Sequence, residues 1–210
     1  MIGIINYGSG NLNAFVNVFK SLEKKTTIIN DPADLKFCSH ILMPGVSAWD
    51  TTMKSLNRFK ETGTLLDCVF NKKIPFLGVC VGMQILSSTS EEGSMPGLKW
   101  IDGNVRRLPV DAMPHDEIFL GPKLPHMGWN TVMGHTNIDL MARLPENPEF
   151  YFLHSYFFDA VNNNNIAATA KHIGFNFPVI VQNENIFGVQ FHPEKSHING
   201  KILLENFSAL

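Results

Sequence analysis

Short apolar runs alternate with helical patterns along the first part of the chain. The runs have the length and composition of buried strands, at residues 2–6, 26–30, 40–43 and 75–79. Between them lie segments with the apolar spacing of helices, at residues 11–22, 49–70 and 81–88. Strand–helix alternation at this spacing predicts a parallel sheet with helices on both faces.

The second part of the chain follows a different pattern, in which short strand candidates are separated mostly by turns. The candidates are residues 104–108, 151–153, 166–170, 179–182 and 188–191. We expect them to extend the sheet in an antiparallel manner, followed by a closing helix at residues 198–207. Because no Pro- or Gly-rich linker divides the chain, we expect residues 1–210 to form one α/β domain: a mostly parallel central sheet with an antiparallel extension.

Composition narrows the possible classes of function. Hydrophobic residues make up 44% and charged residues 17% of the 210 residues, which is typical of a globular protein. The net charge of -2 gives no reason to expect nucleic acid or a membrane as partner. The chain has no signal-like N-terminus and three cysteines without C-x-x-C spacing. We therefore expect a cytoplasmic protein without disulfides, metal or cofactor.

The segment that carries candidate chemistry is residues 75–84. A buried strand ends near Gly78, and Cys80, Gly82 and a helix follow. This order is that of a nucleophile elbow, G-x-nucleophile-x-G, with cysteine in place of serine. Glycines two residues on either side allow strand and helix to approach closely. The same pattern also occurs around structural cysteines, so on its own it leaves both interpretations open.

A thiolate nucleophile needs a histidine, and the histidine needs a carboxylate that orients it. His192 and Glu194 follow the last strand candidate and are separated by Pro193, which stiffens the turn. An isolated His-x-Glu pair is usually a surface feature. Combined with an elbow at Cys80, it predicts a Cys–His–Glu triad.

These segments resemble a known family. Residues 78–84 (GVCVGMQ) and 191–196 (FHPEKS) are similar to those of the class I, triad-type glutamine amidotransferases. Three segments look like the glutaminase subunits of imidazole glycerol phosphate synthase: residues 7–12 (YGSGNL), 125–130 (PHMGWN) and 151–156 (YFLHSY). The resemblance covers the whole chain and implies a flavodoxin-like fold. It also implies hydrolysis of L-glutamine and transfer of ammonia to a cyclase subunit, in a heterodimer of histidine biosynthesis.

The resemblance also implies roles for particular residues. Cys80 would attack the glutamine carbonyl, His192 would move the protons, and Glu194 would orient His192. Residues that would hold the substrate or its oxyanion are Gly45, Val46, Gln84, Glu92, His154, Ser155 and Tyr156. Residues that would lie near the partner interface or the ammonia exit are Asn11, Trp129 and Lys195.

The sequence departs from the family pattern at Ser47, where glycine is usual, at Val81, where leucine is usual, and in an irregular segment at residues 110–123. Glycine before the elbow would ease a peptide rearrangement that completes an oxyanion hole. Forcing serine to positive φ would cost ~1–2 kcal/mol. We therefore expect Ser47 to restrict that rearrangement.

Three other functions are possible on the sequence. A paralogous glutaminase subunit would feed a sugar-modifying enzyme of bacterial surface glycan biosynthesis, and a neighbouring partner gene would decide between the pathways. A catalytically silent regulatory subunit would not need the complete triad. A cysteine hydrolase for another amide would not need the matches at Gln84 and residues 154–156.

Overall fold

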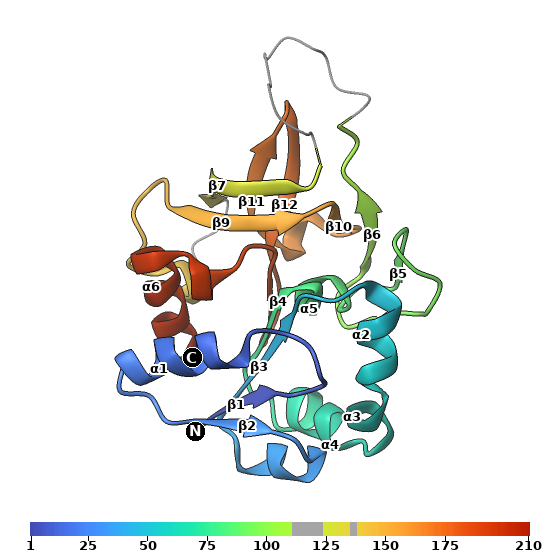
Figure 1. Ribbon diagram of the computed structural model, residues 1–210, viewed down its shortest axis with the longest axis vertical. Helices are drawn as coiled ribbons and strands as arrows, with labels where there is room; N and C mark the ends of the chain where they lie inside the picture. The colour runs from blue at the N-terminus through green and yellow to red at the C-terminus, as the bar shows by residue number, and fades with distance from the viewer. Residues whose placement is uncertain (111–123, 135–137) are drawn as a thin grey trace.

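The computed structural model describes residues 1–110, 124–134 and 138–210 (Figure 1). The irregular segment that we noted at residues 110–123 lies outside these ranges apart from Val110. Within the described residues, no helix is long and apolar enough to cross a bilayer.

The main sheet has eight strands in the described part of the chain, in the order β2-β1-β3-β4-β13-β12-β11-β8. The first five run parallel: β2 (Thr26–Ile29), β1 (Ile2–Ile5), β3 (His40–Gly45), β4 (Phe76–Cys80) and β13 (Ile186–Val189). The other three are antiparallel: β12 (Phe175–Asn183), β11 (Ile166–His172) and β8 (Met133–Gly134). Parallel strands buried on both faces are expected to be apolar throughout, as β1 and β4 are.

Helices cover both faces of the parallel strands, as predicted. Figure 1 shows α1 (Leu12–Ser21) and α6 (His197–Phe207) on one side of the sheet and α2 (Trp49–Ser55) on the other. Helix α1 buries Phe15 and Phe19, four residues apart on one face. The remaining helical segments are η1 (Pro32–Phe37), α3 (Asn57–Glu61), α4 (Thr64–Leu66), η2 (Asp67–Asn71), α5 (Val81–Gln84), η3 (Asp139–Met141), η4 (Asn163–Asn165) and η5 (Pro193–Lys195).

Helix α5 is shorter than the helix predicted at residues 81–88. It stops at Gln84, and the following backbone groups take partners outside the helix. The N–H of Ser88, which would donate to the Gln84 carbonyl in a helix reaching residue 88, donates to the Gly103 carbonyl at 2.9 Å instead. Leu98 donates to the carbonyl of Ile85 at 2.8 Å, and Trp100 donates to that of Leu86 at 2.8 Å, which satisfies carbonyl groups that the end of a helix leaves free.

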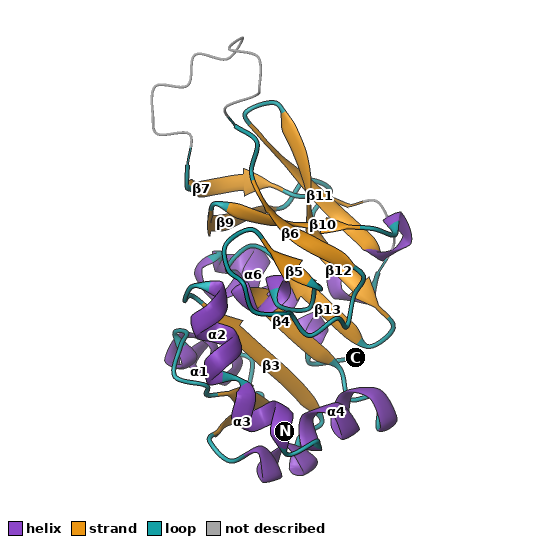
Figure 2. Cartoon of the chain, turned by 90° about the vertical axis from the view of Figure 1, so that its right-hand side faces the viewer, coloured by secondary structure: helices purple, strands orange, loops and turns teal. Residues whose placement is uncertain are grey.

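The predicted antiparallel extension is confirmed for the strands at residues 166–170 and 179–182 and is wrong for the other three. Residues 188 and 189 belong to β13, which pairs in parallel with β4, and residues 190 and 191 lie beyond its end. Residues 104–108 belong to β6 (Gly103–Arg107), in a separate sheet with β10 (Tyr156–Ala160) and β5 (Thr89–Ser90). Residues 151–153 belong to β9 (Glu149–His154), which pairs with β7 (His126–Thr131). Figure 2 shows these smaller sheets beyond the parallel strands.

Candidate active site

A cavity of about 410 Å³ opens where the parallel strands end. Asn11 follows β1, Val46 follows β3, Cys80 ends β4, and His192 follows β13, and all four residues line this cavity. Ligands of open parallel sheets bind at the carboxyl ends of the strands, because the loops there converge. The topology therefore brings together residues that are up to 181 positions apart in the sequence, from Asn11 to His192.

Cys80 occupies the strained position of an elbow between β4 and α5. Its backbone has φ 55° and ψ -112°, a conformation that residues with a side chain rarely adopt. The neighbouring glycines explain how strand and helix can pack so closely. A Cβ atom on Gly78 would lie 2.3 Å from the carbonyl oxygen of Gly82, and one on Gly82 would lie 2.2 Å from that of Met43. Strain of this kind is typical of functional sites.

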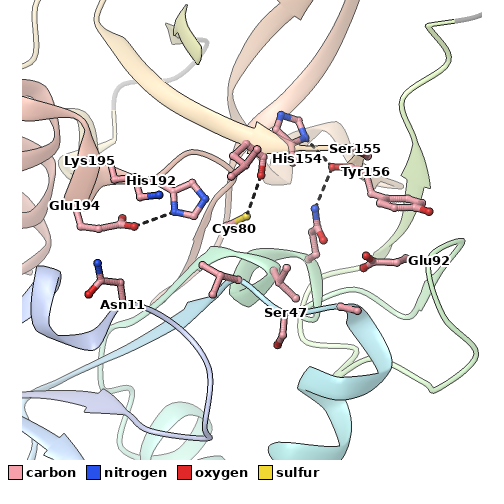
Figure 3. A pocket seen from close by; sticks show the side chains of 15 residues that line it. Asn11, Ser47, Cys80, Glu92, His154, Ser155, Tyr156, His192, Glu194 and Lys195 are labelled. Atoms are coloured by element: carbon pink, nitrogen blue, oxygen red, sulfur yellow. Dashed lines mark hydrogen bonds and ion pairs between the residues drawn. The ribbon is translucent and has the colours of Figure 1, made fainter. Parts of the chain in front are cut away.

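His192 and Glu194 form a buried pair beside Cys80 (Figure 3). His192 Nδ1 donates to Glu194 Oε1 at 2.9 Å, which leaves the other ring nitrogen for the thiol. Burial alone lowers the pKa of His192. Its hydrogen bonds to Cys80 and Glu194, together with their negative charges, outweigh burial and raise this pKa to about 10. The arrangement therefore favours a protonated His192 beside the Cys80 sulfur.

Two further groups approach the sulfur. The thiol of Cys80 lies 3.9 Å from the carbonyl oxygen of Leu153, and Gln190 Nε2 donates to Sγ at 3.7 Å. Gln190 is completely buried directly after β13, and Gln84 donates to its Oε1 at 3.1 Å. Gln190 was not among the residues predicted from the sequence. A single polar residue inside the buried run at residues 186–191 was the signal that could have identified it.

Most of the residues predicted to hold glutamine line the cavity, but their side chains differ in orientation and burial. Val46, Gln84, Glu92, Ser155 and Tyr156 all line it. Gln84 Nε2 donates to the Tyr156 carbonyl at 3.0 Å. Burial raises the pKa of Glu92, and the hydrogen bond from the Trp49 N–H to its carboxylate, at 3.1 Å, lowers it in part.

His154 also borders the cavity, but its ring lies on the inner face of β9. The side chains of Leu153 and His154 point to opposite faces, because they are consecutive in a strand. Leu153 is partly exposed at the cavity, whereas His154 is buried and its Nδ1 lies 2.8 Å from the Tyr156 carbonyl. The imidazole therefore supports the wall of the cavity from behind.

The predicted oxyanion segment lies next to the elbow. Gly45 pairs with Cys80 in the parallel register and is buried behind the cavity surface, whereas Val46 is exposed in it. Ser47 lies 2.9 Å from Thr52, Oγ to Oγ1, which ties the segment to α2. Ser47 is not among the residues with positive φ in the described chain.

The three residues predicted to be near a partner occupy the rim and the surface beyond it. Asn11 and Lys195 line the cavity, whereas Trp129 lies outside it on β7. Trp129 stacks on the His197 ring at 5.0 Å between centroids, and Lys195 Nζ lies 5.5 Å from the centre of the Tyr151 ring. Trp129 also contacts Tyr151, at 6.1 Å between ring centroids, so the Trp129–His197 pair and the Lys195–Tyr151 pair adjoin each other.

Comparison with known proteins agrees with this architecture. The family model for class-I glutamine amidotransferases matches residues 4–209. The protein named imidazole glycerol phosphate synthase subunit HisH is 47% identical in Leptospira interrogans and 42% identical in Bdellovibrio bacteriovorus, over 210 residues and 100% of both chains in each case.

Solved structures share the fold at lower identity. A crystal structure described as a glutamine amidotransferase has a TM-score of 0.72 at 16% identity and covers 99% of this chain and 98% of its own. The structure of PurLQS from Thermotoga maritima has a TM-score of 0.73 at 12% identity and covers 99% and 97%. The chain therefore belongs to the class-I glutamine amidotransferase family and, within it, to the group of HisH subunits of imidazole glycerol phosphate synthase.

Proposed function

We propose that this chain hydrolyses L-glutamine and delivers the ammonia to the cyclase subunit of an imidazole glycerol phosphate synthase, in histidine biosynthesis. The observation that carries the proposal is the meeting of Cys80 with the buried His192–Glu194 pair in one cavity. The full-length relatives named HisH support this pathway over that of surface glycans.

In the proposed reaction, the Cys80 sulfur attacks the side-chain carbonyl carbon of glutamine. The C–N bond breaks as His192 gives its proton to the leaving nitrogen, and ammonia departs from a thioester. Water then attacks the thioester carbon, His192 accepts a proton from it, and glutamate leaves as the sulfur regains its negative charge. Glu194 holds the His192 ring with Nδ1 bound, so that the other nitrogen serves each proton transfer.

The negative charge that develops on the glutamine oxygen needs backbone donors. We assign this role to the segment at Gly45 and Val46, because it borders the elbow and Val46 lines the cavity. The link between Ser47 and Thr52 holds the next residue against α2. A partner that changed the peptide orientation here would regulate hydrolysis through the stability of that oxyanion.

The outer face of β7 and β9 is the surface that we assign to the cyclase. Met127, Trp129 and Leu153 are 65%, 48% and 38% exposed, and they share one face of this strand pair. Apolar side chains gathered on an exposed sheet face are typical of interaction sites. Lys195 lines the cavity and lies over Tyr151 of β9, which would give ammonia a short route from the cavity to a subunit docked on this face, and Asn11 also lines the cavity.

The proposal is tested with the reconstituted two-subunit enzyme. Cys80→Ala should lower glutamine-dependent product formation at least about a thousandfold, because no nucleophile remains. Free ammonia should still support the cyclase reaction in that complex. Cys68→Ala is the matched control, since Cys68 is buried in η2 and does not line the cavity, and it should remain active. Failure of ammonia to replace glutamine would contradict the ammonia-donor role.

A further inference from the structure

A pair of buried histidines lies directly behind the wall of the cavity. His126 and His154 stand opposite each other in the β7–β9 pairing, with His126 Nδ1 2.9 Å from His154 Nε2. Both rings pack among apolar side chains, including Phe152 and Phe177. Polar groups in such surroundings cost free energy unless each is hydrogen-bonded. The pair therefore needs a defined arrangement of protons.

The contact of His154 with the Tyr156 carbonyl determines which ring nitrogens carry protons. The carbonyl of Tyr156 can only accept, so His154 Nδ1, 2.8 Å away, must carry the proton. In a neutral ring Nε2 is then unprotonated and accepts from His126. It follows that His126 is protonated at Nδ1 and unprotonated at Nε2.

The contact of His126 with Asn130 independently requires the same positions for the protons. Asn130 Oδ1 accepts from the Thr131 N–H at 2.8 Å, which identifies its other atom as the amide nitrogen. That Nδ2 donates to the carbonyl of Lys171 at 2.8 Å and to His126 Nε2 at 3.1 Å. Because Nδ2 has no acceptor capacity, His126 Nε2 must be the unprotonated nitrogen. The contacts with Tyr156 and with Asn130 therefore lead to the same result: both rings are protonated at Nδ1 and unprotonated at Nε2.

A second proton on either ring would set two N–H groups against each other. The electrostatic surroundings point in the same direction. Burial, and secondarily the neighbouring histidines, lower the pKa of His126 to about 3. Burial also lowers the pKa of His154, to about 4, although the Tyr156 carbonyl opposes this. Both rings are therefore neutral near pH 7, as the hydrogen-bond chain requires.

The chain continues from the histidines to the nucleophile. The Tyr156 carbonyl, which His154 holds, also accepts from Gln84 Nε2 at 3.0 Å. Gln84 donates in turn to Gln190, and Gln190 donates to the Cys80 sulfur. Ser155 and Tyr156 line the cavity, so the carbonyl held by His154 belongs to the wall that glutamine would face.

We propose that His126 is a positioning residue for the glutaminase site: it fixes the tautomer of His154, which holds the Tyr156 carbonyl and with it the cavity wall opposite Cys80. This inference rests on the proposed function. His126 acts through His154 and does not contact glutamine.

Two substitutions of His126 separate this role from simple packing. His126→Phe keeps a planar ring but removes the donor to His154. In the two-subunit enzyme it should lower kcat/KM for glutamine at least about tenfold, while the ammonia-dependent reaction changes by less than about twofold. His126→Asn places an amide N–H near the former Nδ1 and should recover part of the loss. His40→Phe is the matched control. His40 is a half-buried histidine at the start of β3, the end that is farther from the cavity, so its substitution should leave both reactions unchanged.

A nitrogen-15 NMR spectrum of the histidine rings in the wild-type complex tests the arrangement directly. Both His126 and His154 should be protonated at Nδ1 and unprotonated at Nε2 at pH 7. A proton on His154 Nε2, full glutamine activity of His126→Phe, or equal losses in the Phe and Asn variants would overturn the inference. The wild-type spectrum decides the matter even if a variant does not fold. A wild-type complex that cannot hydrolyse glutamine would instead contradict the proposed function.

Discussion

The parallel strands and the β7–β9 pair border the same cavity, but they supply different kinds of groups to it. β4 ends in Cys80 and β13 is followed by His192, and both side chains can react. β9 and the residue after it supply part of the wall, with the Leu153 carbonyl near the sulfur and Ser155 beside the cavity. Behind this wall, the side chain of His154 turns inward and is held by His126.

This difference shows how the work of a site can be divided between two parts of a fold. A reacting side chain depends on its own identity and on the strand end that presents it. A backbone wall depends on the side chains packed behind it, which never touch the substrate. We therefore expect substitutions around the elbow to have larger effects than comparable substitutions in β7 and β9.

The largest contrast is expected between two glycines. A Cβ on Gly82 would lie 2.2 Å from the Met43 carbonyl oxygen, so Gly82→Ala must separate α5 from β3. We expect it to lower the free energy of unfolding by roughly 3 kcal/mol and glutamine hydrolysis at least about a thousandfold.

Gly128 in β7 is the matched control for this substitution. It has φ +125°, but a Cβ there would meet nothing within 4 Å. Gly128→Ala should therefore cost only about 1–2 kcal/mol of backbone strain. Urea unfolding and steady-state glutamate release measure both effects. Equal losses in the two variants would contradict the division between elbow and wall.

An intermediate effect is expected at Glu194. Glu194→Gln keeps the shape of the side chain but weakens its hold on the protonated His192. Hydrolysis should fall roughly a hundredfold, which is less than for Cys80→Ala, because Glu194 orients and does not react. Glutamate release by the complex at saturating glutamine provides the measurement, and an unchanged rate would remove Glu194 from the proposed triad.

The same variant has a consequence for stability at alkaline pH. The pKa of His192 is about 10 in the folded protein and 6.5 ordinarily, so between these values the folded state holds a proton that the unfolded state has lost. The resulting stabilisation is fully present below about pH 6.5 and is lost as the pH rises towards 10. Glu194→Gln should flatten this decline, which urea unfolding at several pH values would reveal. Parallel curves for both proteins would argue against the His192–Glu194 ion pair.

The smallest effect is expected at Ser47. Ser47→Gly removes the link to Thr52 and widens the backbone choices next to the proposed oxyanion segment. Glutaminase activity of the isolated chain, which should be very low in the wild type, should rise about threefold, or roughly 0.6 kcal/mol in barrier. Thr52→Val removes the same hydrogen bond without changing the backbone at residue 47. An equal rise in both variants would assign the effect to the hydrogen bond, and no rise in Ser47→Gly would remove the restriction that we attribute to serine.

The sequence alone predicted four of the five parallel strands and the residues that could form a triad. Apolar runs such as residues 2–6 are buried on both faces of a parallel sheet, so their composition reveals them. Cys80, His192 and Glu194 stand in short motifs, because an elbow and a rigid turn each need particular residues at fixed spacing. Motifs of this kind can be recognised from the sequence because the residues of each motif are close together in the chain.

Only the tertiary structure decided the pairing of the later strands and the support behind the wall. Residues 186–189 join β4 in parallel because the chain returns to the centre of the sheet after β12, which no local pattern shows. His126 and His154 are 28 positions apart in the sequence and become partners only when β7 pairs with β9. The proton order between them depends on hydrogen bonds from four separate strands, since each ring nitrogen takes its role from the group that folding places opposite it.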